Sequence, residues 1–500
     1  MSRALLGLAG ALALVQVGRF AGAPYVLDDA WISASIADNL VTHGAPTYTL
    51  GAAPVEGMTN GACTLSLAAW IAWFPGVDPI AIARVVGALL WLLAIAVLAR
   101  AAARRVAPDA KLRAAAVTTV VLAASGSAAF HAGAGLETGG WALLGALAID
   151  AFVAIGEKNP RAELHLGLVA AAMVTWRPEG VLLGGAFVAA ALWRRRTWAT
   201  WVATALPWAC AVAAVTAIRW HVYGALVPNT FHAKPPDPFA GLSDLGLFVG
   251  YGLGGVGLLA LTTARWSGRA RALVLIATVM VAGTVWSGGD WMPGYRRFTF
   301  AYLVVAWALG VAAVASTNVT RRRLACVGVV GCLLGNAVAA ARSLDHGAYS
   351  PYAMADLAAR CNATPGVDTV ALVDIGRFGW HFDGRVVDLA GLTDAEIAAV
   401  PGHHLDKFDG AIFDARDADL AFVFVDTDAP GDAPWSSGPI HIRTPVEARL
   451  RAHLDASSHW RLHGFVRYGA RTWIAVFARN ELALSPSIWG PRWSSSDPRG

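Results

Sequence analysis

The stretch PIAIARVVGALLWLLAIAVLAR, residues 79–100, has only one charged side chain, Arg84, before its last residue. It is long enough to cross a bilayer as a single helix. Four further Lys and Arg residues follow between positions 104 and 113. Because positively charged loops stay on the cytoplasmic side, we expect this end of the helix to face the cytoplasm.

The same pattern of apolar run and basic cluster recurs up to about residue 341. The expected spans are 4–24, 79–100, 114–130, 139–156, 164–177, 180–193, 198–218, 243–263, 272–287, 298–316 and 324–341, with a short interfacial helix at 59–74. This arrangement places every strong basic cluster on one side. It predicts an α-helical polytopic membrane protein with about eleven transmembrane helices. A cleaved signal peptide ending at residues 21–23 is the alternative for the first run.

Charged residues are scarce and unevenly divided. They make up 15% of the chain, against about 25% in soluble proteins. Residues 1–342 hold 25 Lys and Arg and 14 Asp and Glu, whereas residues 343–500 hold 14 and 20. The basic residues lie in short clusters between apolar runs, as in cytoplasmic loops, so no nucleic-acid partner is expected.

From Pro351 the pattern becomes that of a soluble α/β domain. Short buried strands are predicted at VDTVALVDIG (367–376), ADLAFVFVD (418–426) and RTWIAVFA (471–478), and helices at 350–361 and 444–455. We therefore divide the chain into a membrane domain (1–342), an extracytoplasmic α/β domain (343–484) and a loosely ordered tail (485–500).

Carboxylates and isolated basic residues gather in the loops expected to face outward. The acidic ones are Asp28, Asp29, Asp38, Glu56, Asp78, Glu137, Glu179, Asp237, Asp244 and Asp290, and the basic ones are Arg177, Arg219, Lys234, Arg296 and Arg297. Outward basic residues oppose the usual bias, and ionisable groups near membrane depth usually mark a site. Carboxylates suit proton abstraction, and Arg and Lys suit a phosphate. We infer a polar cavity for a phosphate-bearing lipid and an acceptor with hydroxyl groups.

Asp28 and Asp29 are adjacent, directly after an apolar run. Their mutual repulsion raises one pKa, which suits acid–base chemistry. We expect one of them to be the catalytic carboxylate, with Asp28 slightly favoured, and the other to orient it or to help hold a divalent cation of the Mg²⁺ type. The alternative is a solvated helix end, where acidic residues are also favoured. No spacing in the sequence demands a metal or another cofactor.

The remaining candidates fall into two groups. Arg296, Arg297, Lys234 and Arg177 are expected to bind the donor phosphate; Glu56, Asn60, Glu137, Asn229, His232 and Asp290 are expected to bind substrate. The alternatives are interface anchoring for the two adjacent arginines, an internal pair with Glu179 for Arg177, and helix capping for Asn60 and Glu137. The HHLD run at 403–406 resembles a metal site only loosely.

Seven motifs occur in order between residues 28 and 394. They are DDAWIS with ADNL, VEGMTN, GLET, WRPEG, YGALVPNTFHAK, GGDWMPGYRRF, and DIGRFGW followed by VVDLAGLTD. Through these motifs the sequence resembles the GT-C fold glycosyltransferases, in particular the terminal β-(1→2)-arabinofuranosyltransferase family of mycobacterial cell walls and its bacterial relatives. It departs from that family at Ser35, where Arg is usual, and at Met58, where Tyr is usual.

The resemblance implies a polyprenyl-phosphate sugar donor and an acidic pair in the first extracytoplasmic loop. The sequence thus predicts a glycosyltransferase of the bacterial inner membrane, with a periplasmic C-terminal domain. It would move a pentose, arabinofuranose by resemblance, to a glycan, glycolipid or protein hydroxyl. The alternatives are a hexose or aminoarabinose transferase of the same fold and a transporter or flippase for a lipid-linked sugar. A transporter predicts internal repeats and charges along the helices, and the sequence shows neither.

Overall fold

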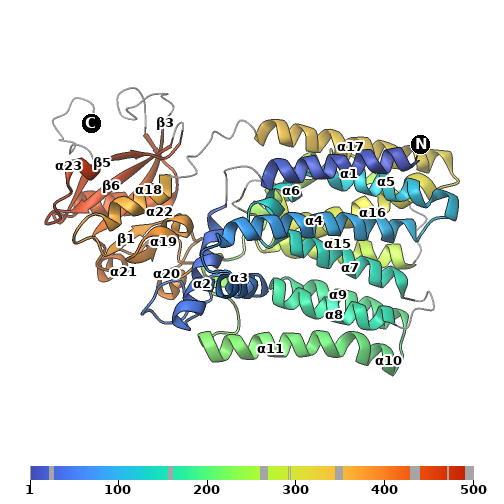
Figure 1. Cartoon of the computed structure of the whole chain (residues 1–500), viewed down its shortest axis with the longest axis horizontal. Helices are drawn as coiled ribbons and strands as arrows, with labels where there is room; N and C mark the ends of the chain where they lie inside the picture. Colours follow the sequence, from blue (N-terminus) through green and yellow to red (C-terminus); the bar gives the residue numbers. More distant parts are fainter. Residues whose placement is uncertain are drawn as a thin grey trace.

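The chain forms a long bundle of roughly parallel helices with a mixed α/β domain at one end (Figure 1). The computed structural model describes residues 2–21, 27–155, 161–259, 268–290, 292, 294–343, 353–427, 440–469 and 472–489. We call residues 353–489 the C-terminal domain. The predicted fold class, a helical membrane protein with a C-terminal α/β domain, is confirmed.

Most of the bundle consists of apolar helices. They are α1 (Ser2–Ala21), α4 (Pro79–Ala103), α5 (Lys111–Ala123), α6 (Gly126–Gly133), α7 (Thr138–Ala154), α8 (Arg161–Trp176), α9 (Gly180–Arg194), α10 and η2 (Trp198–Ala205) continuing into α11 (Leu206–Tyr223), α13 and η3 (Pro238–Gly252), α15 (Gly268–Trp286), η4 and α16 (Arg296–Ala315) and α17 (Val319–Ser343). Within the described residues, five helices are long and apolar enough to cross a membrane, or six if the bent pair α5–α6 counts as one span. The count of eleven stays a prediction.

Two predicted helices end differently from expectation. The helix predicted at 114–130 is two helices with a 67° bend between them, because the Ser125 hydroxyl accepts a hydrogen bond from the Ala128 amide and starts α6 afresh. The helix predicted at 243–263 begins earlier, at Pro238, and its regular turns end at Gly252. Gly254 and Gly255 follow with φ of 58° and 70°, which breaks a right-handed helix. Residues 260–263 lie outside the described part of the chain.

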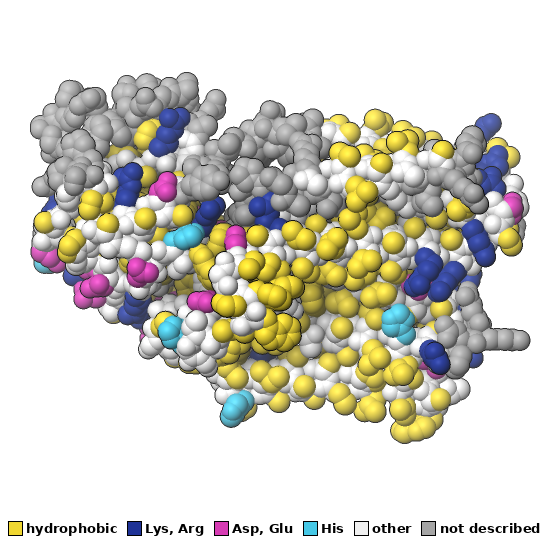
Figure 2. All heavy atoms as spheres, in the orientation of Figure 1, with side chains coloured by type: hydrophobic (Ala, Val, Ile, Leu, Met, Phe, Trp, Pro, Cys, Tyr) yellow, Lys and Arg dark blue, Asp and Glu magenta, His cyan; other side chains and the backbone are white. Residues whose placement is uncertain are grey.

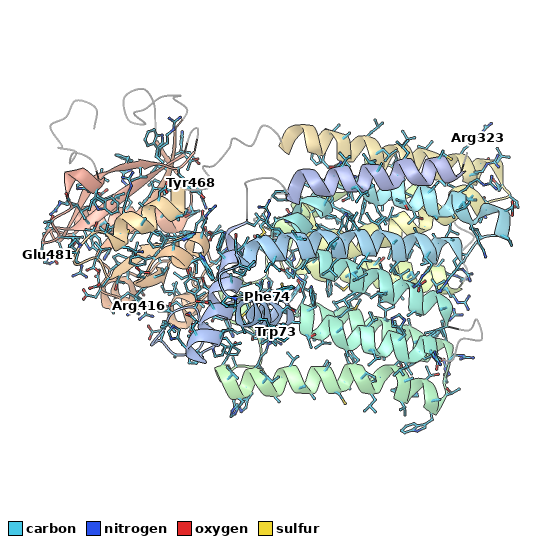
Figure 3. All side chains as sticks on the ribbon, in the orientation of Figure 1. Trp73, Phe74, Arg323, Arg416, Tyr468 and Glu481 are labelled. Atoms are coloured by element: carbon cyan, nitrogen blue, oxygen red, sulfur yellow. The ribbon has the colours of Figure 1, made fainter. Side chains whose placement is uncertain are left out.

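The surface of the bundle is that of a multi-pass membrane protein. A broad belt of apolar side chains covers it, and Lys and Arg gather at the end remote from the C-terminal domain (Figure 2). Arg323 lies at that end, whereas Trp73 and Phe74 lie where the bundle meets the C-terminal domain (Figure 3). The Trp73 side chain is 75% exposed at the end of α3 (Gly61–Trp73). Such an aromatic side chain suits the membrane–water interface.

The C-terminal domain is built on one mixed sheet. Its strands are β1 (Thr369–Leu372), β2 (Arg385–Asp388), β3 (Leu420–Thr427), β4 (Ile440–Ile442), β5 (Trp460–Arg467) and β6 (Thr472–Arg479). The order is β2-β1-β3-β6-β5, with β4 paired to β3, and β1 runs parallel to both β2 and β3. The three predicted strands correspond to β1, β3 and β6.

Short helices complete the C-terminal domain. They are α18 (Ala353–Asn362), α19 (Ile375–His381), α20 (Ala395–Ala399), α21 (Gly410–Ala415), α22 (Pro445–Ala456) and α23 (Pro486–Trp489). The predicted helices at 350–361 and 444–455 correspond to α18 and α22. Of the tail proposed at 485–500, Trp489 is buried and donates a hydrogen bond to the Thr364 hydroxyl. Residues 490–500 lie outside the described part.

The C-terminal domain is docked on the segments that join the membrane helices. α2 (Asp28–His43) packs against α19, and α12 (Asn229–Ala233) packs against α20. The Asp28 carboxylate accepts hydrogen bonds from the amides of Gly376 and Arg377, at 2.6 and 2.8 Å. The Tyr48 hydroxyl donates to the Ile375 carbonyl at 2.6 Å. These bonds place the start of α2, with its two aspartates, at the junction of the two domains.

Gly376→Ala is expected to weaken this docking. A Cβ at position 376 would lie 2.0 Å from the backbone oxygen of Asp28, so α19 must shift away from α2, at a cost of about 1–3 kcal/mol. We expect a lower melting temperature and faster proteolysis between the domains. Gly246→Ala is the matched control, because a Cβ there meets nothing within 4 Å. Equal melting temperatures for the two variants would contradict this account of the interface.

Candidate functional site

A cavity of about 1030 Å³ lies where α2 and α12 meet the bundle and the C-terminal domain. Eight of the twelve residues predicted to form the site line it: Asp29, Asn60, Glu137, Arg177, Lys234, Asp290, Arg296 and Arg297. The other four, Asp28, Glu56, Asn229 and His232, are not part of its lining. Most of the predicted site residues therefore lie around one cavity. The structure shows which of them line the cavity and which make contacts outside it.

One wall of the cavity is an ion-pair network between the loops before α7 and α9. Arg177 contacts the carboxylates of both Glu137 and Glu179, the latter at 2.9 Å. Burial alone would raise the pKa of Glu179, but Arg177 and Arg297 hold it at about 2. Asn60 donates a hydrogen bond to Glu137 at 3.3 Å. Because two carboxylates already neutralise Arg177, the geometry favours its internal pairing over phosphate binding.

The two adjacent arginines have different surroundings. Arg296 is paired with Asp290, and this ion pair lowers the pKa of Asp290 although burial opposes the shift. Arg297 instead donates to the Gly288 and Gly289 carbonyls and to the Ser287 hydroxyl, and its nearest paired carboxylate, Glu179, is 3.9 Å away. The charge of Arg297 is therefore the less compensated of the two.

The Asp29 carboxylate and the Lys234 ammonium group face the cavity, and neither side chain has a hydrogen-bond partner among the residues that the structure describes. Burial raises the pKa of Asp29, although Lys234 and Arg296 oppose the shift. Burial likewise lowers the pKa of Lys234, against the attraction of Asp29 and Asp290. A carboxylate and an ammonium group left free on a cavity wall are available to a ligand.

The sequence slightly favoured Asp28 as the base, and this stays a prediction, but Asp28 is not part of the cavity lining. Its carboxylate is occupied by the amides of Gly376 and Arg377. Burial and the nearby Asp374 raise the pKa of Asp28 to about 7, against the effect of the two amides. Because Asp28 is engaged, the residues do not fit a cation held between Asp28 and Asp29. Within the described residues, no group of three His, Cys, Asp or Glu side chains is arranged to hold a metal ion.

Three predicted substrate ligands serve structural contacts instead. Glu56 is paired with Arg219 at 2.8 Å. The Asn229 amide donates to the carbonyls of Gly391 and Leu392 in the C-terminal domain, both at 2.9 Å. The His232 side chain is exposed away from the cavity lining, and its carbonyl accepts a hydrogen bond from Lys407 at 3.4 Å. Substrate binding by these three is not supported, because their polar groups are engaged elsewhere or point outward.

The cavity also has an apolar extension that the sequence did not reveal. Leu182, Gly185 and Ala189 of α9 face Met280 and Gly283 of α15 along it. Leu182 is 44% exposed, so this part of the lining is accessible and is not filled by neighbouring side chains. Only the packing of α9 against α15 creates this groove, and each helix alone has the composition of an ordinary membrane span.

Two histidines of the C-terminal domain complete the lining. His403 and His404 precede α21 and lie beside Leu392 in the wall. The sequence offered them only as part of a loose metal motif. Their position depends on how the C-terminal domain docks, and no local pattern encodes that.

Comparison with solved structures decides the fold. ArnT from Cupriavidus metallidurans in the apo state matches with a TM-score of 0.55 and 16% identity, over 97% of this chain and 98% of that chain. The apo oligosaccharyltransferase from Archaeoglobus fulgidus matches with a TM-score of 0.54 and 11% identity, over 96% and 88%. The chain has the GT-C fold.

A second structure of ArnT from Cupriavidus metallidurans, bound to undecaprenyl phosphate, matches with a TM-score of 0.53 and 15% identity. The match covers 94% of this chain and 97% of that chain. A family model described as a domain of unknown function (DUF8728) matches residues 342–477. No curated protein matches the chain. At these identities the likeness shows the fold, and the relation to arabinofuranosyltransferases stays a prediction.

Proposed function

We propose that this protein is a membrane glycosyltransferase that moves a sugar from a polyprenyl-phosphate donor to an acceptor hydroxyl on the periplasmic side of the bacterial inner membrane. The observation that carries the proposal is a single cavity. It joins a polar chamber, which holds the free Asp29 and Lys234, to the apolar groove between α9 and α15. The shared fold of ArnT, one structure of which binds undecaprenyl phosphate, supports the same assignment.

The lining divides naturally between the two parts of such a donor. The polyprenyl chain fits the groove formed by small and apolar side chains of α9 and α15. The phosphate is attracted to Lys234, which forms no ion pair within the described residues, and to Arg297, whose paired carboxylate, Glu179, is 3.9 Å away. Arg296 lies beside them but shares its charge with Asp290. A cation that is not already neutralised gains most from binding an anion in a water-poor site.

Asp29 is then the base for transfer. Its carboxylate takes the proton of the acceptor hydroxyl while the hydroxyl oxygen attacks the anomeric carbon. The bond between that carbon and the phosphate oxygen breaks, and the lipid phosphate leaves with the bonding electrons. Lys234 and Arg297 stabilise the charge that develops on the phosphate. A single displacement of this kind inverts the anomeric configuration.

The order of the seven motifs supports a pentose donor, with arabinofuranose as the proposed sugar. The test is transfer by the purified protein in lipid nanodiscs, with synthetic polyprenyl-phosphoryl arabinofuranose as donor and octyl arabinofuranoside as acceptor. We expect the elongated glycoside in the mass spectrum. Transfer only from hexose or aminoarabinose donors would correct the sugar. Movement of the lipid across liposome membranes without any transfer would replace the proposal with a flippase.

A further inference from the structure

The C-terminal domain contributes a pair of imidazole rings to the cavity wall. His403 and His404 line the side formed with α12, where Phe231 and Lys234 also lie. The groove between α9 and α15 belongs to other elements of the same cavity. The polar chamber is therefore closed by a part of the chain that holds neither the proposed base nor the proposed phosphate ligands.

The two rings are in hydrogen-bond contact, so that His403 holds the ring of His404 in position. Nδ1 of His404 and Nε2 of His403 are 3.2 Å apart, and the ring centroids are separated by 4.2 Å. The His404 side chain is only 4% exposed. Within the described part of the chain, Nε2 of His404 has no hydrogen-bond partner. This nitrogen is not among the side-chain atoms that are buried without a partner, so it is open to a ligand in the cavity.

His404 is suited to a neutral ligand group. Burial, followed by the charges of Lys234, His403 and Lys407, lowers its pKa to about 2. The ring is thus uncharged near neutral pH, and its free nitrogen offers a single hydrogen bond. An uncharged ring does not attract a phosphate as Lys234 does, whereas a sugar hydroxyl both donates and accepts hydrogen bonds.

Apolar side chains beside the histidine pair suit the other face of a sugar. Phe231 is 53% exposed, and Met58, one of the two residues at which the chain departs from the family pattern, lies in the same lining. Aromatic rings offer a rigid apolar face at little conformational cost. Phe231, Met58 and His404 together provide an apolar face and one polar contact.

We propose that His404, held in place by His403, binds a hydroxyl group of the acceptor, and that the acceptor is a glycan terminus entering between α12 and the C-terminal domain. This inference rests on the proposed function. In this proposal the C-terminal domain contacts the acceptor directly, and the membrane domain binds the donor.

The test measures acceptor binding separately from transfer. Octyl arabinofuranoside is titrated into the full-length protein in nanodiscs without donor, and binding is followed by tryptophan fluorescence. We expect His404→Ala to weaken binding about tenfold, the usual effect of one lost hydrogen bond. His404→Gln, which keeps a polar nitrogen near the same place, is expected to restore part of the affinity. His459→Ala is the matched control, because His459 is exposed and does not line the cavity.

A probe with every hydroxyl methylated separates hydroxyl recognition from apolar contact. We expect the wild-type protein and His404→Ala to bind it with equal, weak affinity. Unchanged binding of octyl arabinofuranoside by both His404 variants overturns the inference, and so does a wild-type protein that does not bind octyl arabinofuranoside. Binding that depends on His404, without any sugar transfer, leaves the acceptor site standing and overturns the proposed function instead.

Discussion

Asp29→Asn is expected to reduce the rate of sugar transfer about a thousandfold, within the range that general-base catalysis contributes. The amide has the size of the carboxylate but cannot take the proton of the acceptor hydroxyl. The Asp29 carboxylate makes no hydrogen bond within the described residues, so we expect the melting temperature to change little. The measurement is kcat with both substrates saturating. Full activity in Asp29→Asn would exclude it as the base.

Asp28→Asn is the informative comparison. An asparagine side chain has one oxygen, so it can accept only one of the two bonds now donated by Gly376 and Arg377. We expect lower stability and looser docking of the C-terminal domain, with a smaller loss of activity than in Asp29→Asn. An equal loss of kcat in two stably folded variants would contradict the division of roles between the adjacent aspartates.

The dependence of transfer on pH follows from the same assignment. The base acts in its ionised form, so activity should fall as the pH drops through the pKa of Asp29. Because burial raises that pKa, the fall should begin above the ordinary aspartate value of 3.8. Lys234 opposes the shift, so its removal should move the acid limb of the profile to higher pH. A profile that stays in place would show that the two groups do not interact.

Lys234→Met is expected to lower kcat/KM for the donor about a hundredfold, as the loss of one preorganised charge contact does. The methionine keeps the apolar stem and removes the ammonium group. The protein should be as stable as the wild type or more so, because the buried ammonium has no hydrogen-bond partner within the described residues. A substitution that lowers activity without lowering the stability of the protein is typical of a residue that binds substrate.

Lys111→Met serves as the control for this variant. Lys111 is an exposed lysine at the start of α5 and does not line the cavity. We expect unchanged donor kinetics in Lys111→Met, measured with the same polyprenyl-phosphate donor in nanodiscs. Unchanged donor affinity in Lys234→Met as well would remove Lys234 from the phosphate site and leave Arg297 as the principal candidate.

Much of the architecture was predictable because it depends on composition over long windows. The long apolar runs gave the membrane helices, and short continuous apolar runs gave β1, β3 and β6. The bend at Ser125 depends on one hydroxyl group that accepts a hydrogen bond from a backbone amide. The composition of a long window does not indicate such a contact. The strands β2, β4 and β5 were not predicted. The strand β2 (RVVD) has only two apolar residues, β4 has only 3 residues, and β5 (WRLHGFVR) mixes charged with apolar side chains.

The sequence indicated most of the residues around the cavity, but it did not indicate what each of them contacts. Nothing local separates Asp28 from Asp29, because the residues that occupy Asp28 lie 348 positions later in the chain. Likewise, phosphate binding was predicted for both Arg296 and Lys234. Only the structure shows that Arg296 already forms an ion pair with Asp290. His404 and the groove along α9 and α15 depend entirely on tertiary packing.

The bond between Asp28 and Gly376 also has a consequence for biosynthesis. The loop that carries the proposed base is made early, yet its partner at α19 emerges only after every membrane helix has been inserted. Until then the acidic pair has no docking surface, and the cavity lacks the wall that contains His404. A ribosome that stalls before residue 376 would thus leave an inserted chain whose cavity lacks this wall. The cavity is therefore completed only when α19 reaches the start of α2.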